Sequence, residues 1–257
     1  MTQKLKLGTT ELTRVGLGTN RLTHTRENVA FIKAAVAAGV QMIDTARLYT
    51  GGQSEQTIGE ALSPVPEGSM VATKGGFGGP GRGRPDVLRA EIEESLRHLR
   101  TGSIALYYLH RVDPQTSLEE SLEVIKEYRD GGKIRLAGIS QVTIEQIERA
   151  RKVLPIAAVQ NHYNLSERVH DPVVDYCAQE GIVFVPFYPL GAEVRPVLRE
   201  IARGHRVTPQ QVMLAWLLRR SPAMLPIPGT LSIDHLHQNL GALELELSDA
   251  EFAALSE

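Results

Sequence analysis

Short apolar runs alternate with longer amphipathic stretches along the whole chain. In one such stretch, Leu88, Ile92, Leu96 and Leu99 recur every three or four positions, as they would on one face of an α-helix. Patterns of these two kinds predict eight strands and eight helices. The strands are predicted at 15–20, 42–46, 70–74, 104–110, 134–140, 157–161, 182–187 and 224–228. The helices are predicted at 27–38, 56–62, 85–99, 118–130, 144–153, 172–179, 208–219 and 233–240.

The predicted strands are short and continuously apolar, as in Ile-Val-Phe-Val at 182–185, which is typical of parallel strands covered by helices on both faces. Eight strand–helix units with no linker between them predict one α/β domain over 1–257. We expect a (β/α)8 TIM barrel, with a doubly wound open sheet as the alternative. Leu5–Leu7 and Glu11–Thr13 flank a Gly-Thr-Thr turn, which predicts an N-terminal β-hairpin that plugs the barrel bottom.

The composition argues against several classes of protein. The 257 residues include 28 Lys and Arg and 30 Asp and Glu, and the net charge of −2 offers no basic field for nucleic acid or membrane. No apolar run is long enough to span a bilayer, and the N-terminus lacks the apolar core of a signal peptide. Cys177 is the single cysteine, which fits a cytoplasmic protein. No His-Glu-x-x-His motif or cysteine pair occurs, so we expect no metal site.

Three consecutive predicted strands end on polar side chains. Asp44 follows Met-Ile in the second strand, Lys74 closes the third, and His110 closes the fourth, while Tyr49 follows Asp44 in a loop. Active sites of parallel barrels gather at the carboxyl ends of the strands, and neighbouring strands lie about 4.8 Å apart. We therefore expect these four side chains to share one site.

The four side chains suit the chemistry of carbonyl groups. The ammonium of Lys74 would lower the pKa of Tyr49 from about 10 toward about 8, and Asp44 would keep Lys74 charged. Tyr49 could then protonate a carbonyl oxygen to which His110 forms a hydrogen bond. A lysine at a strand end is also typical of Schiff-base aldolases. That alternative requires an uncharged lysine, which a paired Asp44 opposes.

The segment Gly76–Gly81 matches the pattern Gly-x-Gly-x-x-Gly after a predicted strand. A dinucleotide-binding fingerprint would continue directly into a helix and be followed by an acid on the next strand. Here Pro85 begins the helix only later, and the next strand closes on His110. We interpret the segment as a mobile loop over the pocket, with Arg82 and Arg84 exposed.

The chain resembles the aldo-keto reductases, in particular a bacterial, pyridoxal-reductase-like branch with Val-Pro-Phe-Phe/Tyr-Pro-Leu-Gly and Ile-Pro-Gly-Thr motifs. The resemblance covers almost the whole chain. Its motifs are Gly16-Leu17-Gly18-Thr19, Ile43-Asp44-Thr45-Ala46 with Tyr49, Ala72-Thr73-Lys74, Tyr107-Tyr108-Leu109-His110, Ile134–Ser140, Val159–Asn164, Val185–Gly191 and Leu225–Thr230.

This resemblance implies NAD(P)H-dependent reduction of aldehydes or ketones, with Tyr49 as proton donor in a tetrad with Asp44, Lys74 and His110. A slow nicotinamide-sensing regulatory subunit is a second alternative. The cofactor is expected to be NADP(H) rather than NAD(H). The residues implied to bind it are Gly18, Thr19, Asp44, Ser140, Gln141, Gln160, Phe187, Tyr188, Pro189, Leu190, Gly191, Ile227, Gly229, Thr230, Ser232, His235, Gln238 and Asn239.

Within this set, Ser140 and Gln160 would hold the nicotinamide carboxamide, Phe187 would stack on the ring, and Gln141 stands where relatives usually have Asn. At the phosphate end, Gly229 and His235 stand where many relatives have lysine and arginine. Thr230, Ser232 and His235 could still bind the 2′-phosphate, at a helix start whose N–H groups favour anions.

The substrate is expected to be a small aldehyde or ketone, including pyridoxal-like aromatic aldehydes. Longer relatives close the pocket with a C-terminal loop. This chain ends about 17 residues after the last predicted helix, so we expect an open pocket. The substrate contacts expected are Asn20, Tyr49, Phe77, His110 and Tyr188.

Overall fold

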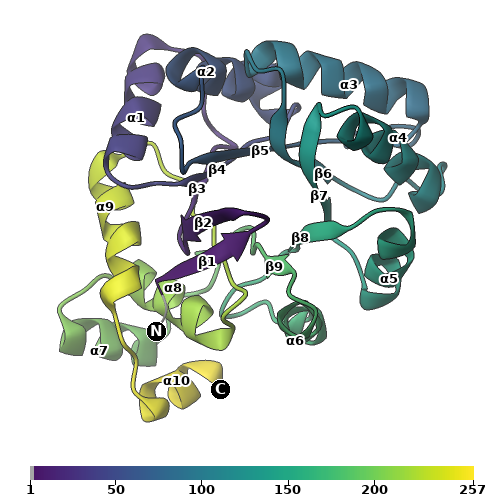
Figure 1. Ribbon diagram of the computed structural model, residues 1–257. Helices are drawn as coiled ribbons and strands as arrows, with labels where there is room; N and C mark the ends of the chain where they lie inside the picture. Colours follow the sequence, from purple (N-terminus) through teal and green to yellow (C-terminus); the bar gives the residue numbers. More distant parts are fainter. Residues whose placement is uncertain (1–2) are drawn as a thin grey trace.

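Seven parallel strands form a curved sheet whose order follows the chain, with helices around its outside (Figure 1). The computed structural model describes residues 3–257, so Met1 and Thr2, which belong to the expected domain and N-terminal segment, lie outside the described residues. The consecutive parallel order confirms the predicted α/β barrel, because an open doubly wound sheet would reverse its order part-way across. The strands are β3 (Leu17–Gly18), β4 (Met42–Asp44), β5 (Met70–Gly75), β6 (Ile104–Leu109), β7 (Ile134–Ser140), β8 (Ile156–Gln160) and β9 (Val183–Phe184).

The eighth strand, predicted at 224–228, is not a continuous strand. The segment closes the ring through isolated bridges to β9 and β3 and through single backbone hydrogen bonds, such as the one from Gly16 N–H to the carbonyl of Pro226. Pro226 and Pro228 have no N–H group, so alternate positions cannot donate to a neighbouring strand and the ladder stays incomplete. The prediction of a full strand was wrong for this reason. The bridges are Phe184–Met224 and Gly18–Gly229.

The N-terminal hairpin is present and consists of the antiparallel strands β1 (Lys4–Leu7) and β2 (Thr10–Thr13). Figure 1 shows it in front of one end of the ring of strands. Leu7 and Leu12 are buried in the same apolar cluster as Met42, the first residue of β4. The hairpin therefore covers the amino-terminal ends of the barrel strands, and the opposite end is left for the site.

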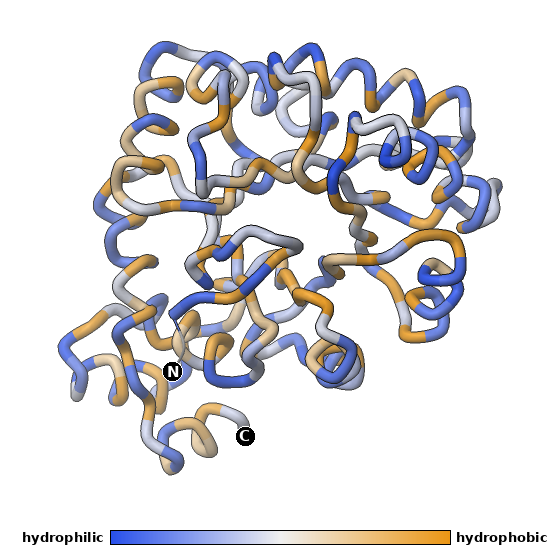
Figure 2. Tube along the Cα trace, viewed as in Figure 1, coloured by the Kyte–Doolittle hydropathy of each residue, from blue (hydrophilic) through white to orange (hydrophobic). Residues whose placement is uncertain are grey.

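Eight of the helices lie where the periodicity predicts them, and two were missed. Figure 2 shows hydrophobic and hydrophilic positions alternating along the helices, whose buried residues pack on the outside of the sheet. The helices are α1 (Arg26–Ala37), α2 (Gln53–Leu62), α3 (Pro85–His98), α4 (Leu118–Asp130), α5 (Ile144–Val153), α6 (Asp171–Gln179), α7 (Pro196–His205), α8 (Pro209–Arg220), α9 (Ile233–Gly241) and α10 (Asp249–Ser256). Two short 3-10 helices are η1 (Tyr49–Gly52) and η2 (Ala242–Glu244).

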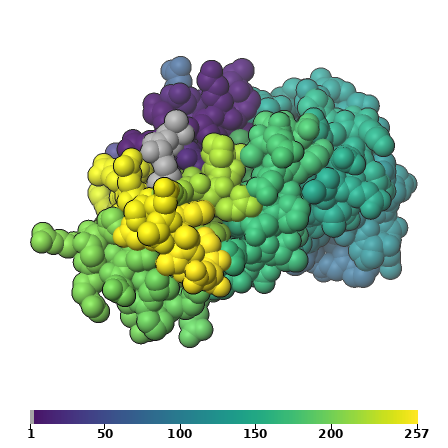
Figure 3. Space-filling model, turned by 90° about the horizontal axis from the view of Figure 1, so that it is seen from below, coloured from purple at the N-terminus to yellow at the C-terminus, as the bar shows by residue number. Residues whose placement is uncertain are grey.

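The missed helices are α7 and α10. Both have local signals, since Pro196 stands at the first turn of α7, and Ser248 and Glu251 form a capping box at the start of α10. The ring of Trp216 in α8 stacks on Phe252, which holds α10 against the outer helices. In Figure 3 the C-terminal residues lie on the part of the chain near residue 200. The C-terminal segment thus packs on the barrel wall.

Candidate active site

Asp44, Tyr49, Lys74 and His110 come together at the carboxyl ends of β4, β5 and β6. Asp44 is the last residue of β4, Lys74 lies near the end of β5, and His110 follows β6 directly. Tyr49 begins η1, and its N–H donates to the carbonyl of Ala46, so the short helix places the phenol beside the strand ends. Side chains that are far apart in the sequence therefore meet because parallel neighbouring strands end at one level.

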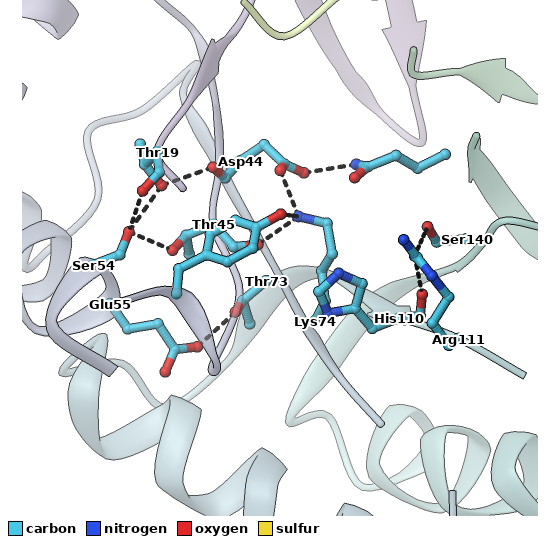
Figure 4. Close-up of polar contacts among 12 residues, drawn as sticks. Thr19, Asp44, Thr45, Ser54, Glu55, Thr73, Lys74, His110, Arg111 and Ser140 are labelled. Carbon is cyan, nitrogen blue, oxygen red and sulfur yellow. Dashed lines mark hydrogen bonds and ion pairs between the residues drawn. The ribbon is translucent and has the colours of Figure 1, made fainter. Parts of the chain in front are cut away.

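The ammonium of Lys74 uses all three of its N–H groups within this site. Its Nζ atom donates to Asp44 Oδ1 at 2.5 Å, to the carbonyl of Thr45 at 2.7 Å and to the hydroxyl of Tyr49 at 3.4 Å (Figure 4). Burial favours the neutral amine, but the attraction of Asp44 and Tyr49 prevails and raises the pKa of Lys74. Lys74 is consequently charged, which does not suit a Schiff-base nucleophile.

Asp44 is held from several sides. Gln160 donates from Nε2 to Asp44 Oδ2 at 2.8 Å, while Lys74 occupies the other carboxylate oxygen. The hydroxyl of Thr19 donates to the backbone carbonyl of Asp44 and contacts the hydroxyl of Ser54 (Figure 4). These contacts fix the carboxylate that orients Lys74.

The pKa of Tyr49 differs from the expectation. Burial of the phenol raises the pKa, and the opposing attraction of the Lys74 ammonium does not outweigh it. The predicted fall toward about 8 is therefore wrong for the protein without ligands. The sequence reveals the lysine, but it does not reveal how deeply the phenol is enclosed. Tyr49 keeps its proton across neutral pH, as a proton donor must.

His110 is a neutral histidine. Burial, together with the charges of Lys74 and Arg111, lowers the pKa of His110 to about 2. Its Nδ1 atom is enclosed and has no hydrogen-bond partner among residues 3–257. The rings of Phe77 and Tyr49 lie 4.9 and 6.0 Å from the imidazole. A neutral ring with an unpartnered Nδ1 can carry its proton on Nε2 and donate it to a ligand.

A cavity of about 650 Å³ opens beside these four side chains. Eleven of the eighteen residues expected to bind a cofactor line it, as do Asn20, Tyr49, Phe77, His110 and Tyr188, the expected substrate contacts. Its volume exceeds the need of a small aldehyde and suits a larger ligand as well. The lining has no residue from η2 or α10. The cofactor candidates in the lining are Gly18, Thr19, Asp44, Gln160, Phe187, Tyr188, Pro189, Leu190, Gly191, Ile227 and Gly229.

The side chains of Ser140 and Gln160, expected to hold the carboxamide, and of the neighbouring Gln141 differ in which hydrogen-bonding groups remain available for a ligand. Gln160 donates its amide to Asp44 and keeps its carbonyl oxygen for a further donor. Ser140, buried at the end of β7, accepts a hydrogen bond from Arg111 at 3.1 Å. Gln141 has a positive φ of 57°. Its side-chain oxygen accepts a hydrogen bond from the N–H of His162 and is therefore already used within the protein.

The three residues expected to bind the 2′-phosphate, Thr230, Ser232 and His235, lie outside the lining of the cavity, which ends at Gly229. Ser232 caps α9 by accepting from the N–H of His235, and Thr230 accepts from the N–H of Ser232. Two N–H groups expected to be free for an anion are therefore already used. His235 and Gln238 are exposed on α9, and Asn239 is buried there.

The loop before α3 is anchored more firmly than expected. Glu91 accepts from the N–H of Gly76 at 2.7 Å and forms an ion pair with Arg82. Asp113 accepts from the N–H groups of Gly81 and Gly83 at 3.0 and 2.7 Å. The interpretation of this segment as a mobile loop was based on its glycines. The two side chains that hold it, Glu91 and Asp113, lie outside the segment, in α3 and after β6. The expectation of an exposed Arg82 is corrected, since it is only partly exposed and is paired.

Sequence reasoning missed one charged residue that lines the cavity close to the four side chains. Arg111 follows His110 and contributes its half-buried guanidinium to the lining. Its position after a polar strand end was the available signal, because the residue that follows such an end can also face the site. Arg21, an exposed residue, lines the cavity as well.

Comparison with known proteins identifies the family. Residues 5–195 and 188–257 match the Aldo/keto reductase family. The chain belongs to this family. It is 34% identical to pyridoxine 4-dehydrogenase of Escherichia coli over 276 residues, covering 97% of this chain and 96% of the relative. It is 37% identical to an uncharacterized oxidoreductase of Schizosaccharomyces pombe, covering 98% of this chain and 89% of the relative.

Solved aldo-keto reductases have the same fold. A thermostable aldo-keto reductase crystallised with the inhibitor epalrestat superimposes with a TM-score of 0.91 at 32% identity, covering 99% of both chains. An aldo/keto reductase from Klebsiella pneumoniae in complex with NADP and acetate gives a TM-score of 0.88 at 27% identity, covering 99% of this chain and 94% of the other. These findings support NAD(P)H-dependent carbonyl reduction by this aldo-keto reductase and do not favour an aldolase or a regulatory subunit.

No helix within residues 3–257 of this aldo-keto reductase combines the length and the apolar character needed to cross a membrane.

Proposed function

We propose that this chain reduces aldehydes to alcohols with NADPH as the hydride source and Tyr49 as the proton donor. The observation that carries the proposal is the contact of one ammonium, Lys74 Nζ, with both Asp44 and Tyr49 beside the neutral imidazole of His110. No protein side chain can supply a hydride, so a bound reduced nicotinamide would supply it.

The proton step follows from the arrangement. As negative charge develops on the carbonyl oxygen, the Nε2–H of His110 donates a hydrogen bond to it. The hydroxyl proton of Tyr49 passes to the same oxygen, and the remaining phenolate is stabilised by the charge of Lys74. Asp44 keeps Lys74 charged throughout. Tyr49 then recovers a proton from solvent, and the alcohol leaves.

The cavity supports a nicotinamide cofactor, since Gln160 and Phe187 line it. Gln160, together with Ser140, would hold the carboxamide, and Phe187, whose ring stacks on His162 at 5.3 Å, would pack against the nicotinamide. Gly18 also lines the cavity. Glycine is required at this position by packing, because a Cβ there would lie 2.7 Å from the carbonyl of Ile227.

The preference for NADPH over NADH is part of the proposal. Solved aldo/keto reductases of Klebsiella pneumoniae contain NADP or NADPH. In this chain Thr230, Ser232 and His235 would receive the 2′-phosphate, with adenine near Gln238 and Asn239. Titration of both cofactors by fluorescence tests this, and tighter binding of NADH would contradict it.

The substrate class is proposed from the relatives and from the lining of the cavity. The relative from Escherichia coli is a pyridoxine 4-dehydrogenase, and the aromatic side chains of Phe77 and Tyr188 lie exposed at the mouth. Both favour pyridoxal-like aromatic aldehydes. A single domain over 1–257 and a cytoplasmic location, for which the buried free thiol of Cys177 is suitable, complete the proposal.

The deciding experiment follows NADPH oxidation with 4-nitrobenzaldehyde and pyridoxal in the parent and in Tyr49→Phe. We expect the variant to lose turnover by a factor of about 100 or more while it binds NADPH as before. Tyr176→Phe is the control, because this hydroxyl contacts Arg151 on the barrel exterior. Parental turnover by Tyr49→Phe, or trapping of substrate on Lys74 by borohydride, would contradict the mechanism.

A further inference from the structure

Arg111 occupies a distinctive place in the cavity. Its guanidinium carbon lies 5.1 Å from the ring centre of Phe77 and 5.5 Å from that of Phe187, so two aromatic rings border the cation. One of its nitrogens, Nη1, donates to the carbonyl of His110 at 2.6 Å and to Ser140 Oγ at 3.1 Å. The guanidinium is therefore held in a defined orientation within the lining of the cavity.

The rest of this guanidinium has no partner in the described chain. No carboxylate of residues 3–257 pairs with Arg111, whereas Arg47, Arg82 and Arg84 each have an acidic partner. Within the same residues, Nε and Nη2 donate to no acceptor, and neither is an enclosed atom. The charge of Asp44 is already matched by Lys74. An unmatched cation thus presents the Nε and Nη2 edge, whose two parallel donors fit a carboxylate.

We propose that Arg111 binds an anionic group of the substrate, so that this enzyme prefers carbonyl compounds bearing a carboxylate. The inference rests on the proposed function and specifies the substrate class of the same site. Phe77 and Phe187 exclude water from the flanks of the guanidinium, which strengthens its attraction for an anion. The aldehyde oxygen faces Tyr49 and His110, and the carboxylate pairs with Arg111 beside them.

This role is compatible with the cofactor contacts proposed above. Ser140 can accept from Arg111 and still donate its own hydroxyl proton to a carboxamide oxygen. The expected 2′-phosphate contacts lie at and just before the start of α9, whereas Arg111 follows β6. Figure 1 shows β6 and α9 on opposite sides of the ring. Arg111 is therefore placed for the substrate and not for the 2′-phosphate of the cofactor.

The test compares 3- and 4-carboxybenzaldehyde with their methyl esters, which have the same ring and aldehyde without the charge. We expect the parent enzyme to have a higher kcat/KM for at least one acid than for its ester. Arg111→Met should lower this acid-to-ester ratio by about 10-fold or more, mainly through KM, while Arg111→Lys keeps part of it. Arg84→Met is the control, because it removes the same charge from an exposed ion pair with Asp86.

Each outcome separates the substrate inference from the proposed function. Reduction of neither acids nor esters by the parent would overturn the proposed function and, with it, this inference. If the parent reduces acids and esters but has no higher kcat/KM for either acid than for its ester, the role of Arg111 alone is overturned. An acid-to-ester ratio of kcat/KM that is unchanged in Arg111→Met would overturn it as well. Arg111→Met could instead lose equal kcat/KM with acid and ester and bind NADPH more weakly by a matching factor. That result would assign Arg111 to the cofactor and overturn the substrate role. A lower ratio with unchanged NADPH binding supports the proposal.

Discussion

Lys74 and Asp44 form an ion pair in which neither side chain is accessible to more than a trace of solvent, with 2.5 Å between Nζ and Oδ1. Each end of the pair also has other partners, namely the carbonyl of Thr45 and the amide of Gln160. A buried pair of this kind is costly to break, because either partner alone leaves an unmatched charge away from water. The pair therefore supports the fold as well as the geometry of the site.

We expect Lys74→Met to lower the free energy of unfolding by about 3–5 kcal/mol, because Asp44 remains buried without its cation. The double variant Asp44→Leu with Lys74→Met should recover part of this loss. Urea unfolding measures both. Lys126→Met, which removes an exposed partner of Glu123, is the control and should change stability by less than about 1 kcal/mol. A Lys74→Met protein as stable as this control would contradict the prediction.

The pH dependence of aldehyde reduction follows from the protonation of Tyr49 and His110. Reduction needs the protonated phenol, and burial raises the pKa of Tyr49, so activity should persist to about pH 10 and fall only above it. The pKa of His110 is about 2, so its ring stays neutral and should give no inflection near its usual value of about 6.5. A profile of kcat/KM at constant ionic strength measures this. A fall between about pH 7 and pH 9 would indicate an acidic Tyr49 instead.

Two glycines within helices should respond oppositely to alanine. A Cβ on Gly59 in α2 would lie 2.1 Å from the carbonyl of His98, a backbone atom that cannot move aside cheaply. We expect Gly59→Ala to destabilise the protein by about 1–3 kcal/mol. A Cβ on Gly204 in α7 meets nothing within 4 Å, so Gly204→Ala should stabilise by up to about 1 kcal/mol. Thermal unfolding of both variants tests the pair, and equal melting temperatures would refute it.

Asp113 should control the order of the loop before α3. Burial opposes its charge, but hydrogen bonds from Gly81, Gly83, Gln115 and Thr116 prevail and lower the pKa of Asp113. Because the folded state favours the carboxylate, this contribution to stability is present at neutral pH and is lost as pH falls below about 4.

Removal of this anchor gives a measurable change. We expect Asp113→Ala to accelerate tryptic cleavage after Arg82 at neutral pH, whereas Pro85 protects the bond after Arg84. Asp86→Ala, which removes an exposed carboxylate from the same region, is the control and should be cut at the parental rate. Equal cleavage of the two variants would show that Asp113 does not hold the loop.

The sequence by itself determined the features that depend on local patterns. Apolar periodicity and capping residues set the limits of α4 and α5. Ser117 with Glu120 and Thr143 with Gln146 form capping boxes at their first residues. Polar residues at the ends of consecutive strands indicated the four side chains of the site, because parallel strands bring their carboxyl ends to one level.

The tertiary structure decided what depends on contacts between distant segments. Pro226 and Pro228 leave the last side of the barrel with isolated bridges. Whether a missing proline N–H breaks a strand depends on whether a neighbouring strand lies where it would accept that hydrogen bond. Enclosure by other elements raises the pKa of Tyr49 against the effect of Lys74. Only the assembled cavity shows that Arg111 has no acidic partner within residues 3–257. Burial and the identity of spatial neighbours arise from packing across the whole barrel, so no local pattern in the chain contains them.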